Sequence, residues 1–134
     1  MDIERVREFF KDDKFATGVG IEIEWAEEGK ACCSMQIQEK HYNAGGSVQG
    51  GAIFTLGDFA FAVAANIGGQ LTVSLNNSIS FISVAKGKKL IAEATRLSES
   101  KRIGVYEVII TDELGTNVAH MVVNGYKKDV TIRL

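Results

Sequence analysis

The spacing of apolar and polar residues divides the first third of the 134-residue chain into a helix, two strands and a loop. Residues 3–10 repeat apolar side chains at helical spacing, which predicts a short amphipathic helix. Residues 21–25 alternate strictly, and residues 31–37 continue the alternation after a glycine-containing turn, so a two-stranded hairpin is expected. Residues 39–49 are polar and rich in glycine, which indicates a loop.

The rest of the chain combines one long apolar helix with four strands. Residues 50–67 predict a long buried helix, which the Gly-Gly pair that follows ends. Residues 71–81 alternate apolar side chains with hydroxyl and amide side chains, so one face of this strand is expected to be apolar. Further strands are predicted at residues 89–98, 103–112 and 117–127. Short turns between the last four strands predict an antiparallel meander, and the whole chain, residues 1–134, is expected to form one α+β domain.

Composition excludes several classes of protein. The chain has 15 basic and 17 acidic residues, which gives no basic surface for nucleic acid. No signal segment is visible, and the apolar stretch from Gly50 contains Asp58 and lacks basic flanks, so a membrane span is not expected. Cys32 and Cys33 are adjacent on a strand, should point to opposite faces, and fit unpaired thiols in a reducing cytoplasm. No cluster has the spacing of metal ligands.

Asp58 is the residue that points most clearly to chemistry, because a carboxylate in an apolar helix must be paired, hydrogen-bonded or in use. Its helix has two faces. One face carries large apolar side chains that can form a core. The other is a stripe of small residues, which would let a second backbone or a narrow ligand approach closely. The stripe consists of Gly51, Thr55, Asp58, Ala62 and Ala65. The alternative interpretation of this stripe is a simple contact between two helices, with Asp58 at the solvent-exposed edge of that contact.

Gly50 and Gly51 leave the backbone at the start of this helix without covering side chains. The first N–H groups of a helix lack internal partners and lie at the positive end of its dipole, so they can bind an oxyanion, although a glycine pair can also be a simple turn. Eight helical residues separate Gly50 from Asp58, which is roughly 12 Å. The two can act on one carbonyl only if they come from different chains. A two-fold dimer with antiparallel long helices would meet this requirement.

The segment from His41 to Phe61 resembles the signature of hotdog-fold acyl-CoA thioesterases of the PaaI type. Residues 79–83 and 100–106 are also similar to that family, and the resemblance extends over nearly the whole chain after residue 18. It implies the hotdog fold, in which an antiparallel sheet wraps around one long central helix. It also implies an acyl-CoA substrate, no separate cofactor because coenzyme A is part of the substrate, and a homodimer or a tetramer of two dimers.

The resemblance implies roles for matching catalytic residues. Asp58 matches the general base or nucleophile, and Gly50 matches the residue whose N–H polarises the thioester carbonyl. Asn43 matches the residue that places the attacking water or the carboxylate, and Ser74 matches a water-orienting serine after a small alignment gap. Gln49 stands where the family usually has histidine; it can donate a hydrogen bond but cannot relay a proton, which limits it to orienting the substrate.

Substrate contacts are expected in three places. The small stripe offers Gly51, Thr55 and Ala62. By resemblance, the segment after Phe81 and the turn before residue 103 hold coenzyme A; they contain Ser83, Val84, Lys101 and Arg102. His41 is expected to be a surface residue or to pack in its loop, and His120 is expected to be structural.

The expected activity is hydrolysis of an acyl-CoA, aromatic such as phenylacetyl or medium-chain, to the free acid and coenzyme A. A module that binds acyl-CoA without cleaving it is the alternative; Asp58 argues against it and Gln49 argues for it. A hotdog hydratase is a weaker match, because it requires an Asp–His pair within one loop and helix start, and no histidine follows Asp58 before His120.

Overall fold

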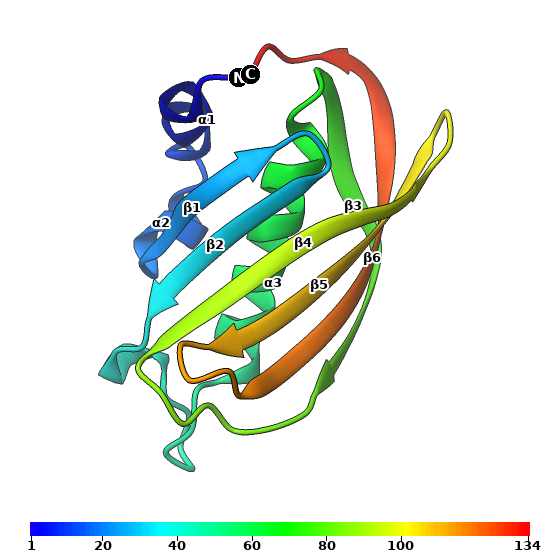
Figure 1. Cartoon of the computed structure of the whole chain (residues 1–134). Coiled ribbons are helices and arrows are strands. Elements are labelled where there is room, and N and C mark those ends of the chain that lie inside the picture. Colours follow the sequence, from blue (N-terminus) through cyan, green and yellow to red (C-terminus); the bar gives the residue numbers. More distant parts are fainter.

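A curved six-stranded antiparallel sheet wraps around the helix α3 in the computed structural model, which describes residues 1–134 (Figure 1). The helices are α1 (Ile3–Phe10), α2 (Lys14–Gly18), the 3₁₀ turn η1 (Glu39–His41) and α3 (Gly50–Asn66). The strands are β1 (Ile21–Glu27), β2 (Lys30–Gln36), β3 (Gln70–Phe81), β4 (Lys89–Glu99), β5 (Ile103–Asp112) and β6 (Asn117–Thr131). The predicted elements are therefore confirmed to within a few residues, whereas α2 and η1 were not predicted. Both α2 and η1 are too short to show a helical period in the sequence.

The strand order in the sheet is β1-β2-β4-β5-β6-β3, so the predicted four-stranded meander is wrong in one position. β4, β5 and β6 do form a meander, but β3 pairs with β6 and not with β4. The connection over residues 82–88 is too long for a tight hairpin and crosses the end of the sheet instead. β3 thereby becomes an edge strand whose outer side has no partner in the chain.

β3 also departs from the predicted single apolar face, because it contains a β-bulge at Leu75. Ser74 pairs with Gly125 and Asn76 pairs with Asn124, so Leu75 has no counterpart in β6. The extra residue reverses the alternation: Thr72 is buried before the bulge, while Leu75 itself is 63% exposed. Asn77 then takes a place on the face that looks toward α3, opposite buried Val123.

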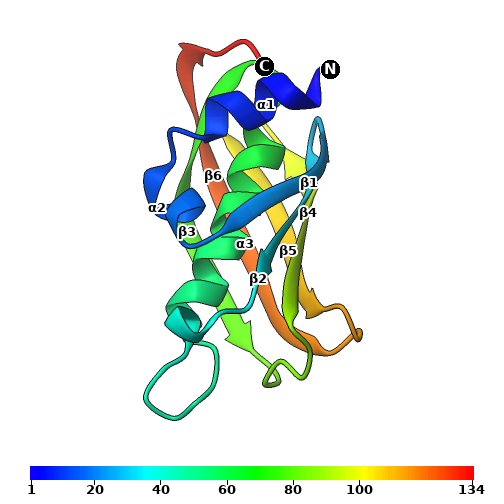
Figure 2. The same ribbon diagram turned by 90° about the vertical axis from the view of Figure 1, so that its left-hand side faces the viewer.

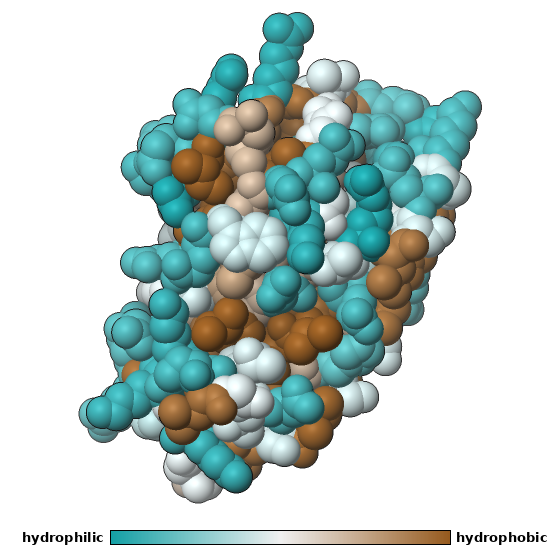
Figure 3. Space-filling model, in the orientation of Figure 1, coloured by the Kyte–Doolittle hydropathy of each residue, from teal (hydrophilic) through white to brown (hydrophobic).

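The core lies between the sheet and α3, and α1 and α2 cover the β1 side of this core (Figure 2). The outer face of the sheet is largely hydrophilic, with apolar groups scattered across it (Figure 3). The face of α3 that was predicted to be core is buried, and its members are Ile53, Leu56, Phe59, Ala60, Val63 and Ile67. All five residues of the small stripe are at least partly exposed, so this stripe lies on the surface of the single chain.

The two cysteines and the two histidines agree with the predictions. Cys32 and Cys33 are buried, unpaired thiols. His41 is buried in its loop, where Nδ1 accepts from Gln38 N at 2.9 Å and Nε2 donates to Val19 O at 2.8 Å. His120 lies on β6 and bonds to Glu107 Oε2 at 2.9 Å. None of the helices has both the length and the apolar character that crossing a bilayer requires.

Candidate active site

Asp58 lies in the middle of α3, half-buried, where its carboxylate meets Asn77 on β3. Its Oδ1 atom is buried and accepts no hydrogen bond within the chain, and the same holds for Oδ1 of Asn77. Burial raises the pKa of Asp58 above its ordinary value, the Asp13 carboxylate raises it further, and the Asn77 amide acts in the opposite direction. Buried polar atoms are nearly always paired, so this unpartnered carboxylate oxygen makes Asp58 a candidate site residue.

The N-terminus of α3 presents free backbone donors. Gly50 N–H and Gly51 N–H find no acceptor within the chain, and the N-cap residue Gln49 makes no side-chain cap bond. Gln49 N donates to His41 O at 2.8 Å, which fixes where the helix begins. The first turn contains no acidic side chain, so the positive end of the helix dipole is not neutralised. This terminus can accept a negatively charged oxygen.

An apolar groove of about 330 Å³ opens beside Gly50. The Phe81 ring forms part of its wall and comes so close that a Cβ atom on Gly50 would lie 3.0 Å from Cζ. Its lining also includes Ile53, Ser83, Val84, Ala85 and Val118. The structure therefore brings three of the predicted residues, Gly50, Ser83 and Val84, into one groove. A narrow apolar chain could lie here with a carbonyl at the helix terminus.

A second groove, of about 460 Å³, lies on the other side of the same helix terminus. It contains Gln49, Gly51 and Thr55, three further residues predicted to touch substrate, together with Tyr42. The Thr55 hydroxyl is already engaged, because it donates to Gly51 O at 2.7 Å. Gln49 Oε1 lies over Gly51, where an added Cβ atom would meet it at 2.7 Å. Glycine at position 51 thus makes room for the glutamine side chain.

Asn43 uses its side-chain oxygen to shape the loop that leads to α3. Oδ1 accepts from Gly45 N at 2.9 Å and from Ser47 N at 3.1 Å. The residue is exposed, and its amide Nδ2 donates to nothing in the chain. The Asn43 amide is thus held in a defined orientation with its donor group available.

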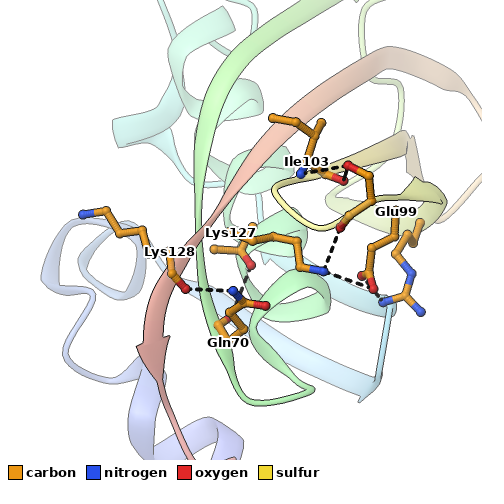
Figure 4. Close-up of polar contacts among 8 residues, drawn as sticks. Gln70, Glu99, Ile103, Lys127 and Lys128 are labelled. Carbon is orange, nitrogen blue, oxygen red and sulfur yellow. Dashed lines mark hydrogen bonds and ion pairs between the residues drawn. The ribbon is translucent and has the colours of Figure 1, made fainter.

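Two of the predicted substrate contacts lie far from Gly50 within one chain. Lys101 and Arg102 belong to the β4–β5 hairpin, which projects at the opposite end of the molecule from the loop before α3 (Figure 1). Arg102 Nη1 pairs with Asp129 Oδ1 at 2.7 Å. Lys127 on β6 reaches the same hairpin, where Nζ pairs with Glu99 Oε1 at 3.2 Å (Figure 4). Gly50 and this hairpin can serve one substrate only across a contact between chains.

Sequence reasoning missed Asn77. It is the β3 side chain that meets Asp58. Ser74, which was predicted to orient water, is exposed and precedes the bulge. A signal was present, because Asn77 is the polar exception among the alternating apolar residues of its strand. Ala62 lies on the partly exposed small stripe of α3, one turn after Asp58. No group of three or more histidine, cysteine or acidic side chains is arranged to hold a metal ion.

An antiparallel sheet wrapped around one long helix is the arrangement of the hotdog fold. The chain belongs to the thioesterase superfamily, whose family model matches residues 45–119. This assignment confirms the family predicted from the sequence.

Three comparisons support the assignment. A protein of Archaeoglobus fulgidus named "Putative esterase" is 35% identical over 106 residues, which cover 78% of this chain and 69% of that protein. The acyl-coenzyme A thioesterase PaaI of Escherichia coli K12 is 32% identical over 111 residues, which cover 82% of this chain and 79% of that protein. The structure of the E. coli PaaI protein from the phenylacetic acid degradation operon superimposes with a TM-score of 0.89 at 29% identity, covering 94% of this chain and 92% of that one. The hotdog fold is thereby confirmed.

Proposed function

We propose that the chain hydrolyses an acyl-CoA thioester to a free acid and coenzyme A, with Asp58 as the reacting carboxylate. The observation that carries the proposal is the half-buried Asp58 carboxylate, whose Oδ1 has no partner and whose pKa is raised by burial. A relative that is 32% identical is named an acyl-coenzyme A thioesterase, which supports coenzyme A as the thiol.

In the proposed reaction, the thioester carbonyl oxygen accepts a hydrogen bond from Gly50 N–H, which polarises the carbon. Water attacks this carbon and passes a proton to Asp58, or Asp58 attacks first and water then cleaves the mixed anhydride. The C–S bond breaks, and coenzyme A leaves as a thiolate that takes up a proton. Asn43 orients the water or the carboxylate through its free amide, and Gln49 orients the substrate.

Each site combines residues of two chains in this proposal. Eight residues of α3 hold Gly50 and Asp58 roughly 12 Å apart, whereas attack needs about 3–3.5 Å between reacting atoms. The unpartnered outer edge of β3 and the exposed small stripe of α3 support a two-fold homodimer with antiparallel α3 helices. Such a dimer brings the β4–β5 hairpin, with Lys101 and Arg102, toward the second chain's Gly50 end. A tetramer of two dimers preserves the same site.

The substrate proposal has two parts. The apolar lining of the groove beside Gly50 supports an acyl chain that is aromatic, such as phenylacetyl, or of medium length. Ser83 and Val84 contact substrate there, and Gly51, Thr55 and Ala62 contact it along α3. The free thiols of Cys32 and Cys33 fit the reducing cytoplasm as the site of action.

A panel of acyl-CoA substrates, with released thiol as the readout, tests the proposal. Wild-type protein should release coenzyme A from at least one aromatic or medium-chain substrate, and Asp58→Ala should abolish release while still folding. Glu8→Ala, which removes an exposed carboxylate paired with Lys11 on α1, serves as the matched control and should keep full activity. Tight binding of acyl-CoA by the wild type without thiol release would replace this proposal with the non-catalytic module, which the glutamine at position 49 favours.

A further inference from the structure

The segment between β3 and β4, residues 82–88, has no regular secondary structure, yet it forms one wall of the groove beside Gly50. Its first residues are tied to the sheet, because Ile82 N and Ser83 N both donate to Val118 O, at 2.8 and 3.3 Å. Val84, in the middle of the segment, is 64% exposed and cannot anchor it by burial. The shape of this wall therefore depends on how the other end of the segment is held.

Asp112, the last residue of β5, holds that other end. Its Oδ2 accepts from Lys86 N at 2.8 Å and from Gly87 N at 2.9 Å. Its Oδ1 accepts from Leu114 N at 3.0 Å and from Thr116 N at 2.9 Å, within the β5–β6 turn. The side chain is 2% exposed, and four backbone donors surround one carboxylate. Asp112 thus fastens two loops to each other.

Glu113, the residue after Asp112, also binds the end of the segment 82–88. Its Oε1 accepts from Lys88 N at 3.0 Å and from Lys89 N at 3.1 Å, and its Oε2 accepts from Lys88 N at 2.9 Å. Its carboxylate also occupies the space above Gly87, where any added Cβ atom would overlap with it. Glu113 is exposed, so its removal leaves the core untouched.

The segment presents backbone N–H donors to both carboxylates. The backbone N–H groups of residues 86–89 all donate to Asp112 or Glu113. The Lys89 ammonium pairs elsewhere, with Glu24 Oε1 at 3.1 Å. Burial acts to raise the pKa of Asp112, but the hydrogen bonds from several backbone N–H groups together outweigh it and hold this pKa below its ordinary value. Backbone N–H groups likewise lower the pKa of Glu113, so both carboxyls are ionised near neutral pH. Hydrogen bonds to an ionised acceptor are stronger than those between neutral groups.

We infer that Asp112 and Glu113 are positioning residues that hold the segment 82–88 in place and thereby set the width of the groove beside Gly50. The inference rests on the proposed function, in which that groove receives the part of the substrate next to the thioester carbonyl. Neither residue touches the reacting atoms, so loosening the wall should weaken substrate binding and leave the chemical step unchanged. Discrimination between acyl chains of different width should fall at the same time.

Steady-state kinetics of Glu113→Ala and Glu113→Gln on a bulky and a slim acyl-CoA test this inference. Glu113→Ala should raise KM about fivefold while kcat stays within about twofold, and the preference between the two substrates should shrink. Glu113→Gln keeps one acceptor oxygen and should show a smaller change. Asp112→Asn, which keeps the shape of the side chain but loses acceptor capacity, should raise KM at least as much as Glu113→Ala.

Val6→Ala is the matched control for lost stability, since Val6 is fully buried in α1 at a distance from the groove. It should lower Tm without changing KM. A fall in kcat at constant KM in the Glu113 variants, or an equal rise in KM in Val6→Ala, would overturn the inference.

A second measurement separates this inference from the proposed function. Backbone amide exchange at residues 86–89 should become faster in Glu113→Ala and remain slow in Val6→Ala, whether or not the protein cleaves any acyl-CoA. Unchanged exchange would show that Glu113 does not hold the segment. Faster exchange together with no thiol release by the wild type would refute the catalytic proposal alone.

Discussion

Asp58 on α3 and Asn77 on β3 lie against each other, and each carries a buried Oδ1 atom that accepts no hydrogen bond within the chain. A buried acceptor without a donor is unfavourable in a protein interior. The Asn77 amide also lowers the pKa of the Asp58 carboxyl, against the effect of burial. This pair of residues motivates the first three predictions.

Asp58→Asn should lower kcat by about 100- to 10,000-fold, because asparagine can neither take a proton nor attack a carbonyl. It should also stabilise the fold at neutral pH. A carboxyl whose pKa is higher in the folded chain contributes stability below its unfolded pKa and loses it as the pH rises through the folded value. The gain in Tm should thus be a few degrees at pH 7 and smaller at pH 4, measured by thermal melts. Equal gains at both pH values would contradict a burial-raised pKa.

Asp13→Asn should shift the acidic limb of the kcat/KM profile to lower pH. The negative charge of Asp13 helps to raise the pKa of Asp58, so its removal lets Asp58 ionise in more acidic solution. Asparagine can still cap α2, where Asp13 Oδ1 accepts from Ala16 N at 3.0 Å. Asp12→Asn, one residue earlier and fully in solvent, is the control and should leave the profile in place.

Asn77→Ala should act in the opposite direction, moving the acidic limb to higher pH, because the amide lowers the pKa of Asp58. It should also reduce kcat by about tenfold, the effect of losing one hydrogen bond to a charged group. Asn76→Ala removes the same side chain from the adjacent, exposed position on the other face of β3. Equal loss of activity in the two variants would argue that Asn77 serves the strand and not the carboxylate.

Gln49→His should be tolerated and should keep or increase the activity, since it introduces the side chain typical of the resembled family. Gln49 is exposed and makes no cap bond with the helix, so the fold does not depend on it. Rates on the preferred acyl-CoA and melting curves measure the outcome. A large drop in kcat/KM with an unchanged Tm would mean that the site is adapted specifically to glutamine.

Mixed dimers test whether two chains build each site. Asp58→Ala and Gly50→Val should each be inactive alone, the second because the larger side chain would press on the Phe81 ring. After subunit exchange, one site of every mixed dimer carries both lesions and the other carries none. Activity should return to about a quarter of wild type for random pairing. Verified exchange without recovery would show that one chain builds the whole site.

Much of the fold was predictable because periodicity reports burial. The alternation of β1 and the helical repeat of α1 gave both elements, and the two faces of α3 were assigned correctly from spacing alone. The pairing of β3 with β6 was not predictable in this way. Local turns indicate which strands follow one another, while the place of a strand in the sheet depends on packing against α3 and on the path of a seven-residue connection.

Parts of the candidate site could be predicted where a single residue is unusual for its position in the sequence. Asp58 stands out as a charge in an apolar helix, and Gly50 and Gly51 stand out as a bare helix start. Asn77 was visible as a polar exception in its strand, but its contact with Asp58 was not, because that contact joins two elements whose relative register is set by a bulge. The hydrogen bonds of Asp112 and Glu113 could not be predicted either, since the sequence does not show which backbone N–H groups lie beside a carboxylate in a turn.

Because Leu75 lies in a bulge, the number of residues in β3 could change without changing which of its side chains face α3. The residues on both sides of it keep regular partners in β6, so removal of Leu75 would leave Ser74 opposite Gly125 and Asn77 opposite Val123. A homologous strand that is one residue shorter could then present the same side chains to its helix. Counting positions along the chain would then misplace them by one. At this point we expect the strand to tolerate loss of a residue, because Ser74 and Asn77 would keep their partners in β6.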